Sequence, residues 1–397
     1  MFKPLEKIKV VDICVAGAGP SCTKLLAEYG ADVIWVEPLC GTSTRNVFKF
    51  DFYTTGKRSI AINLKSEEGQ EFIRRVLSTA DVFVSNYRPK ALRHLGLEYE
   101  ILHSLNPRLI YATLTGFGEE GPEADEPGYD PVAFWSKGGM LLDFAEKGSL
   151  LVPPYAVGDI ITGQALAGGI LAALLDREKT GTGERVFTSL MAEAAYANHD
   201  AIVETQFGEI YPKSRLAPRR ALLNTYRCKD GKWITISIPN DFDRYFEPLM
   251  RVLELQGLID NPRWATAEDT IGDNAPAFVK ILDGAFAKLT QEEALRRLHA
   301  IDVPCAKVLG TAEFMHDEQA LANNCFYEIP TLDGNTLTIP ANPVKFGTKH
   351  SGKPEKCGPH LGEHTKEILQ EYGYQDTEIH TLLNNGLALQ YGIQEDT

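Results

Sequence analysis

Along the first 190 residues, apolar and polar positions alternate in a way that predicts strands followed by helices. Short apolar runs bounded by polar or glycine-rich turns predict buried strands. Between them lie segments with helical spacing, and Ser66 is placed to cap one such helix because Glu67 and Glu68 follow it. The predicted strands are 8–15, 32–37, 58–64, 81–85 and 109–115. This alternation predicts an α/β fold with a parallel sheet covered on both faces.

The pattern changes after residue 205. Two β-like runs, 222–228 and 233–238, flank Lys229-Asp230-Gly231, which predicts a hairpin. Thr290 and Glu293 have capping-box spacing, and the tail predicts helices over 362–372 and 376–383. We therefore expect a doubly wound large domain beginning in 1–215, a small α+β domain in 220–325, and a segment 330–397 that returns to complete the large domain.

Composition narrows the class of protein. The net charge of −14 disfavours nucleic acid as a partner, so an anionic ligand would need a locally basic pocket. The seven cysteines contain no C-x-x-C pair, which argues against a zinc site and against a disulfide framework. The N-terminus lacks the apolar core of a signal peptide, and no uncharged run predicts a membrane span. We expect a cytoplasmic protein without a metal.

A glycine turn follows the first predicted strand. Gly17-Ala18-Gly19 is typical of dinucleotide-binding turns, and an NAD-dependent oxidoreductase is one interpretation. The fingerprint is incomplete, however, because Cys22 stands at its third glycine position and Pro20 removes a backbone donor. A nicotinamide cofactor is therefore disfavoured, although such a turn can still hold the phosphates of another nucleotide.

Asp159 follows Gly158 at the start of a long apolar segment, 160–175. One interpretation is a helix N-cap, because aspartate accepts backbone N–H bonds there. The other is a nucleophile kept ionised by the same donors. A second carboxylate, Asp130, follows the glycine-rich loop 116–128 and is a candidate partner for Asp159, or a solvated turn residue.

Eight short stretches, found in one order, stand out along the chain: 11–20, 30–37, 57–60, 80–86, 116–122, 158–159, 180–184 and 358–365. Together they resemble the class III CoA-transferases (CaiB/BaiF type), the family of formyl-CoA transferase and crotonobetainyl-CoA:carnitine CoA-transferase. Within this family, the segment from Gly128 to Gly139 looks most like enzymes that exchange CoA among 2-hydroxyacyl, enoyl and aryl-propanoid acids in fermenting anaerobes.

The resemblance implies a Rossmann-like large domain, an interlocked homodimer, and Asp159 as the catalytic nucleophile. Asp159 would attack a donor thioester to give a mixed anhydride and then an aspartyl-CoA thioester, from which CoA passes to an acceptor acid. Coenzyme A and acyl-CoA are then substrates, and no metal or nicotinamide is needed. The protein must supply positioning and backbone N–H donors for the oxyanions.

The same resemblance implies the contacts to CoA. Basic residues of segment 88–94 would hold its phosphates, with a solvated helix face as the alternative interpretation. Pro38 and His94 stand where formyl-CoA transferase has arginines, so the adenosine end is expected to be held differently. The predicted contact residues are Gly17, Ala18, Ile62, Lys65, Asn86, Tyr87, Arg88, His94, Tyr129 and Asp130.

An α-methylacyl-CoA racemase is the nearest alternative within this fold. Those enzymes need a histidine in a Gly-His-Asp loop as a second proton-transfer residue, and here Tyr129 takes its place. A non-catalytic CoA-binding protein is a further alternative. For a CoA-transferase, we expect Phe134, Trp135 and Met140 to form an apolar floor for a bulky acyl group.

Overall fold

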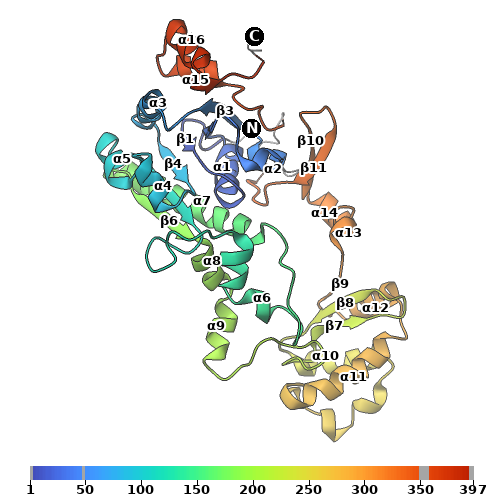
Figure 1. The fold of residues 1–397 in the computed structure, drawn as a ribbon. Helices are drawn as coiled ribbons and strands as arrows, with labels where there is room; N and C mark the ends of the chain where they lie inside the picture. Colours follow the sequence, from blue (N-terminus) through green and yellow to red (C-terminus); the bar gives the residue numbers. More distant parts are fainter. Residues whose placement is uncertain (1–2, 47–49, 348–356, 393–397) are drawn as a thin grey trace. The chain divides into compact units, whose positions relative to one another are not determined.

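The computed structural model describes residues 3–46, 50–347 and 357–392. Figure 1 traces the chain, which folds into two compact units. Unit 1 is Met1–Met140, Pro153–His199 and Gln319–Thr397, and unit 2 is Leu141–Val152 and Asp200–Glu318. The domain boundaries 1–215, 220–325 and 330–397 stay a prediction; the compact units differ from them by assigning 141–152 and 200–215 to unit 2 and 319–325 to unit 1.

A seven-stranded sheet organises unit 1, in the order β12-β3-β2-β1-β4-β5-β6. All neighbouring strands are parallel except β12, which pairs antiparallel with β3. The expectation of a wholly parallel sheet is thus wrong at this edge, because the C-terminal segment folds back and covers the free side of β3. The strands are β1 (Lys9–Asp12), β2 (Asp32–Glu37), β3 (Lys57–Ile62), β4 (Val82–Ser85), β5 (Ile110–Thr115), β6 (Arg185–Ser189) and β12 (Ala388–Leu389).

The strand order fixes where a ligand can bind. In the sheet, β2 and β3 lie on one side of β1, and β4, β5 and β6 lie on the other. The chain therefore adds strands first on one side of β1 and then on the other. In such α/β sheets the crevice at the carboxyl ends of the strands, where the winding direction reverses, is the usual ligand site. Here that point lies between β1 and β4.

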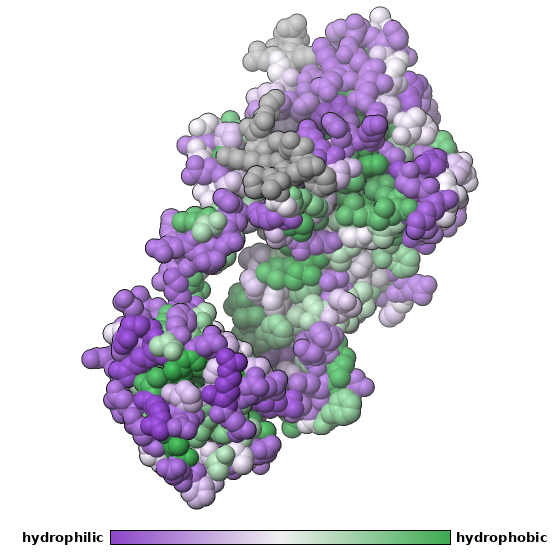
Figure 2. All heavy atoms as spheres, turned by 180° about the vertical axis from the view of Figure 1, so that it is seen from behind, coloured by the Kyte–Doolittle hydropathy of each residue, from purple (hydrophilic) through white to green (hydrophobic). Residues whose placement is uncertain are grey.

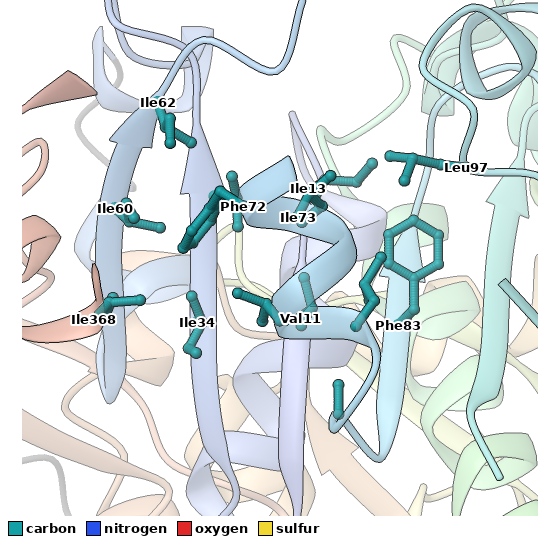
Figure 3. Close-up of a cluster of buried hydrophobic side chains, with 14 of the residues drawn as sticks. Val11, Ile13, Ile34, Ile60, Ile62, Phe72, Ile73, Phe83, Leu97 and Ile368 are labelled. Carbon is teal, nitrogen blue, oxygen red and sulfur yellow. The ribbon is translucent and has the colours of Figure 1, made fainter. Parts of the chain in front are cut away.

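One face of the sheet is covered by α3, α15 and α16. In Figure 3, Phe72 and Ile73 of α3 lie over Ile34, Val11 and Phe83 of the strands, with Ile368 at the side. The predicted cap is confirmed, because the Ser66 hydroxyl accepts a hydrogen bond from the Gly69 N–H at 3.1 Å. Five helices contribute buried side chains to the core on this face: α3 (Glu67–Leu77), α4 (Pro89–His94), α5 (Tyr99–Leu105), α15 (Thr365–Glu371) and α16 (Asp376–Asn384).

The long helix α7 (Val157–Thr180) packs with α1 (Ala18–Glu28), β5 and β6. By length and composition α7 could cross a membrane, but 44% of its most apolar window is buried inside the protein. We therefore describe it as a core helix. The remaining helices and strands of unit 1 are α2 (Phe50–Thr54), the π-helical turn η2 (Pro131–Ser136), α8 (Leu190–Ala197), the hairpin β10 (Phe326–Pro330) and β11 (Thr336–Pro340), and the short η1 (Ser43–Asn46).

Unit 2 has its own core, built around the predicted hairpin. β7 pairs antiparallel with β8, and β9 adds to β8. The Thr290 hydroxyl accepts from the Glu293 N–H, as the spacing predicts. The main elements are β7 (Leu223–Arg227), β8 (Trp233–Ser237), β9 (Cys305–Lys307), α10 (Phe242–Val252), α11 (Ala275–Phe286), α12 (Gln291–His299) and α13 (Thr311–Phe314); α6 (Met140–Asp143), α9 (His199–Thr205) and α14 (Glu318–Ala322) lie where the units join in sequence.

A buried ion pair fixes α1 to the sheet. The Lys57 ammonium on β3 lies 3.0 Å from Asp12 Oδ2 on β1, and neither side chain is exposed. Lys57 also donates to the Thr23 hydroxyl of α1 at 2.7 Å, and Thr23 donates to Asp12 at 2.6 Å. Because each buried group has a charged or polar partner, the network is tolerated inside the core.

Lys57→Met should lower the free energy of unfolding by about 3–5 kcal/mol, because Asp12 would remain buried without its counter-charge. Urea unfolding followed by circular dichroism measures this loss. Lys65→Met, which changes an exposed lysine, is the control and should shift stability by no more than about 0.5 kcal/mol. A loss below about 1 kcal/mol for Lys57→Met would mean that Thr23 and the backbone alone satisfy Asp12.

Candidate functional site

A cavity of about 490 Å³ lies at the carboxyl ends of β1, β4 and β5, at the reversal point of the sheet. Such a volume falls in the range of small-molecule sites. Its lining combines one carboxylate from α7 with basic groups from α4 and an acidic stretch of the loop 116–128. The lining residues are Val15, Ala16, Ala18, Asn86, Tyr87, Arg88, Lys90, Ala91, His94, Leu114, Thr115, Gly116, Ala124, Asp125, Glu126, Pro127, Gly128, Tyr129, Asp159 and Leu190.

Asn86 joins the two strands that flank the reversal point. Its side-chain oxygen accepts from the Val15 N–H at 2.9 Å, and its amide donates to the Val15 carbonyl at 2.6 Å. This paired contact holds the end of β4 against the turn after β1. In that turn Ala16 has a φ of 62°, a left-handed conformation that side chains rarely adopt. Strained residues of this kind concentrate at functional sites.

Asp159 is the third residue of α7, in its first turn. The N-cap position belongs to Ala156, which has a φ of 65° and makes no side-chain cap hydrogen bond. The interpretation of Asp159 as the N-cap is therefore wrong. The carboxylate still benefits from the positive end of the helix dipole, which favours its ionised form.

The turn between β1 and α1 lies directly against Asp159. A Cβ atom on Gly17 would come within 2.2 Å of Asp159 Oδ2, so only glycine leaves room for the carboxylate. The Ser21 hydroxyl is 3.3 Å from the Asp159 carbonyl oxygen. A Cβ on Gly163 of α7 would meet Ser21 Oγ at 2.0 Å and the Ala18 carbonyl oxygen at 2.6 Å. The first turns of α1 and α7 thus interlock around the carboxylate.

Asp130 is buried beside the start of α7, only 3% exposed. A Cβ on Gly158 would lie 2.3 Å from Asp130 Oδ1, so this carboxylate also depends on a glycine for its space. Burial raises the pKa of Asp130, while the backbone N–H groups of Ala156, Gly158 and Asp159 and the Trp135 indole oppose the rise. Asp130 therefore lies near the N–H groups that begin α7, and neither of its buried oxygens accepts a hydrogen bond from the described residues.

Tyr53 of α2 lies near Asp159 and Asp130, a position that was not predicted from the sequence. Its side chain is 2% exposed. Burial raises the pKa of Tyr53, and the negative charges of Asp159 and Asp130 raise it further. No local signal marks this residue, because α2 reaches both aspartates only through the tertiary fold.

The basic segment 88–94 divides between two cavities. Arg88, Lys90 and His94 line the large one. Arg93 lines a neighbouring cavity of about 200 Å³. His94 is further held by its Nδ1 atom, 2.7 Å from the Lys90 carbonyl oxygen. Arg88, Lys90 and His94 thus share the cavity that contains Asp159, and their role as a phosphate-binding patch stays a prediction.

The structure brings together Ala18, Asn86, Tyr87, Arg88, His94, Tyr129 and Asp159 as lining residues of one cavity. Gly17 lies against Asp159 without being one of the lining residues. The cavity lining does not include Ile62, Lys65 or Asp130 among the described residues: Ile62 is buried under α3, and Lys65 is exposed after β3. Asp125 and Glu126 also line the cavity, and their sequence context did not predict this.

The expected apolar floor is not open to a ligand within unit 1. Phe134, Trp135 and Met140 are each buried, and the η2 turn that carries the first two packs on α8. These residues therefore serve the core. In the described parts of the chain, no group of three or more His, Cys, Asp or Glu side chains is arranged to hold a metal ion.

Comparison with known proteins gives a consistent result. The profile of CoA-transferase family III matches residues 5–365. The (R)-2-hydroxy-4-methylpentanoate CoA-transferase of Clostridioides difficile is 34% identical, over 94% of this chain and 97% of that protein. The cinnamoyl-CoA:phenyllactate CoA-transferase of Clostridium sporogenes is 32% identical, over 94% and 95%. A crystal structure of a CaiB/BaiF family protein from Brucella suis is similar with a TM-score of 0.80 and 29% identity, covering 94% of this chain and 100% of that one.

Gly163→Ala should destabilise unit 1 by about 1–3 kcal/mol, because the added methyl group would press on the Ala18 carbonyl oxygen and force α1 and α7 apart. Urea unfolding with tryptophan fluorescence measures the change. The matched control is Gly284→Ala in α11, where a Cβ meets no heavy atom within 4 Å. Helix propensity should make that variant more stable by up to about 1 kcal/mol. Equal shifts for both variants would contradict the close packing at Gly163.

Proposed function

The chain belongs to CoA-transferase family III, and we propose that it transfers CoA from an acyl-CoA thioester to a free carboxylic acid through Asp159. The observation that carries this proposal is a carboxylate in the first turn of α7 that lines the large cavity and is not used as the helix N-cap. A nucleophile of this kind must be ionised and accessible, and the helix dipole favours the ionised state.

The reaction consists of four acyl exchanges. An Asp159 oxygen attacks the carbonyl carbon of the donor thioester. CoA departs as a thiolate, and a mixed anhydride of Asp159 and the donor acid forms. The thiolate attacks the Asp159 acyl carbon, which releases the donor acid and forms an aspartyl-CoA thioester. The acceptor carboxylate attacks this thioester and expels thiolate again. Attack of the thiolate on the acceptor acyl carbon frees Asp159 and gives the new acyl-CoA. Each step exchanges one activated acyl group for another, so positioning and oxyanion stabilisation are what the protein supplies.

CoA occupies the large cavity in this proposal. Arg88, Lys90 and His94 meet the phosphates, a local basic surface in a chain of net charge −14. The backbone around Ala18 and the side chain of Asn86 flank the nucleotide, and Tyr129 lies along the pantetheine arm. The contact at Ile62–Lys65 rests on the family resemblance alone.

Asp130 has a positioning role in this proposal. Its carboxylate faces the N–H groups at the start of α7, where a capping side chain would otherwise be needed. Asp130 thereby supports the first turn from outside the helix and leaves the Asp159 carboxylate for chemistry.

We assign the acids to the 2-hydroxyacyl, enoyl and aryl-propanoid class. Support comes from the two clostridial relatives, whose names specify a 2-hydroxy-4-methylpentanoate and a cinnamoyl/phenyllactate pair. A racemase would need a histidine where Tyr129 lines the cavity, and tyrosine is a poor base at neutral pH. The proposed location is the cytoplasm, where acyl-CoA is available.

A homodimer is also part of the proposal. Hydrophobic residues gather in patches on the face shown in Figure 2. In unit 1, Leu175 of α7 and Tyr196 of α8 are 69% and 80% exposed, and Tyr155 just before α7 is 82% exposed. A Cβ on Gly168 of α7 would meet no heavy atom within 4 Å, so another chain can approach the helix closely. Exposed apolar surface of this kind is typical of interfaces.

Asp159→Asn should abolish CoA exchange between acyl-CoAs and free acids, because the amide cannot form the anhydride, while CoA binding stays within about threefold of the wild type. Mass spectrometry of products from a panel of acyl-CoAs and acids measures exchange, and calorimetry measures binding. Hydroxylamine trapping should modify Asp159 in the wild type during turnover. Asp130→Asn is the comparison variant: it should still be trapped at Asp159 but turn over more slowly. Full activity of Asp159→Asn would remove the assignment.

The double variant Leu175→Arg/Tyr196→Arg should sediment as a monomer, whereas the wild type should sediment as a dimer, because two buried charges per chain would disfavour the interface. Analytical ultracentrifugation measures this. Ile101→Arg, an exposed apolar site on α5, is the control and should remain dimeric. A monomeric wild type at micromolar concentration would refute the dimer.

A further inference from the structure

The loop 116–128 closes on itself beside the basic residues of the cavity. A Cβ on Gly116 would lie 2.6 Å from the Gly128 Cα atom, so the two ends of the loop touch backbone to backbone. Loops whose ends meet in this way are compact surface structures. The contact between Gly116 and Gly128 holds the acidic part of the loop, which includes Asp125, in a defined place next to α4.

Asp125 contacts the basic segment in three ways. Its carbonyl oxygen accepts a hydrogen bond from Arg88 Nη1 at 3.0 Å. Its carboxylate accepts from the Lys90 N–H at 3.3 Å and lies 3.9 Å from Arg93 Nη2. Asp125 also lines the large cavity together with Arg88 and Lys90. Asp125 thus lies next to the groups to which we assign the CoA phosphates, and its own ion pair is with Arg93, which lines the neighbouring cavity.

Glu126 lines the cavity beside Asp125, whereas two other acids of the loop pair with bases elsewhere. Glu123 pairs with Lys137 at 3.0 Å, and Glu119 pairs with Arg185. The Asp125 carboxylate is about half exposed, as is the Arg93 guanidinium. An ion pair this exposed is weak, so Arg93 neutralises the Asp125 carboxylate only in part and leaves its charge close to Arg88 and Lys90.

We propose that Asp125 competes with the CoA phosphates for the basic segment and so shortens the residence of CoA esters in the cavity. This inference rests on the proposed function. The Asp125 carboxylate neutralises part of the positive charge on α4. A bound phosphate must share that charge with the nearby carboxylate, which weakens binding. The effect suits an exchange enzyme, because the product acyl-CoA must leave in every turnover.

The test compares CoA affinities by calorimetry for the wild type and Asp125→Asn, which removes the charge and keeps the shape. The variant should bind CoA about three- to tenfold more tightly and release it more slowly. The gain should be smaller for dephospho-CoA, which carries less charge, and absent for pantetheine, which has no phosphate. Raising the salt concentration should reduce the gain. Glu120→Gln removes an exposed charge from the same loop outside the cavity lining and should leave affinity within about twofold.

Any of five outcomes would overturn the inference. Weaker CoA binding by Asp125→Asn would show that Asp125 stabilises the cavity wall. An equal gain for Glu120→Gln would show an effect of net charge alone, and an equal gain for pantetheine would show a change of shape. A wild type that exchanges CoA while Asp125→Asn binds no more tightly would refute this inference and leave the proposed function standing. A wild type that does not bind CoA would refute both.

Discussion

The buried contact between Lys57 and Asp12 is the constraint from which the position of Asp159 follows. This ion pair and the Thr23 hydroxyl fix α1 on the sheet, so the turn before α1 has one place at the end of β1. Gly17 in that turn lies against the Asp159 carboxylate. The charge network buried in the core thus determines where Asp159 lies at the edge of the sheet, since packed interiors transmit displacements.

Three glycines allow close contacts around the two carboxylates. At Gly17 the missing side chain leaves room for Asp159, at Gly158 it leaves room for Asp130, and at Gly163 it lets α7 touch α1. None of the three has a left-handed φ, so the requirement is for space and not for backbone freedom. Two carboxylates can therefore stand at one helix start, where the dipole and backbone N–H groups offset part of their repulsion.

The sequence predicts those features that depend on neighbouring residues. The Ser66 and Thr290 caps, the hairpin at Asp230-Gly231 and the strands β1 to β5 follow from local spacing, and the structure has them. Strand β6 (Arg185–Ser189) was not predicted. The antiparallel edge strand β12 was missed because two residues carry no periodic pattern. The cap interpretation of Asp159 was wrong because Ala156 adopts a left-handed φ, which alanine does not signal.

The site was predictable only where the family resemblance supplied long-range information. Asp159, Asn86, Arg88 and Tyr129 come from segments far apart in sequence, and spacing alone does not place them in one cavity. The positions of Tyr53 and Asp125 could not be predicted from the sequence, because the neighbours of each come together only in the tertiary fold. A protein of net charge −14 that binds a polyanion must gather positive charge locally. Under our proposal, Asp125 offsets part of that charge, so the affinity for CoA is a balance between attraction and release, as an enzyme that passes CoA from one acid to another requires.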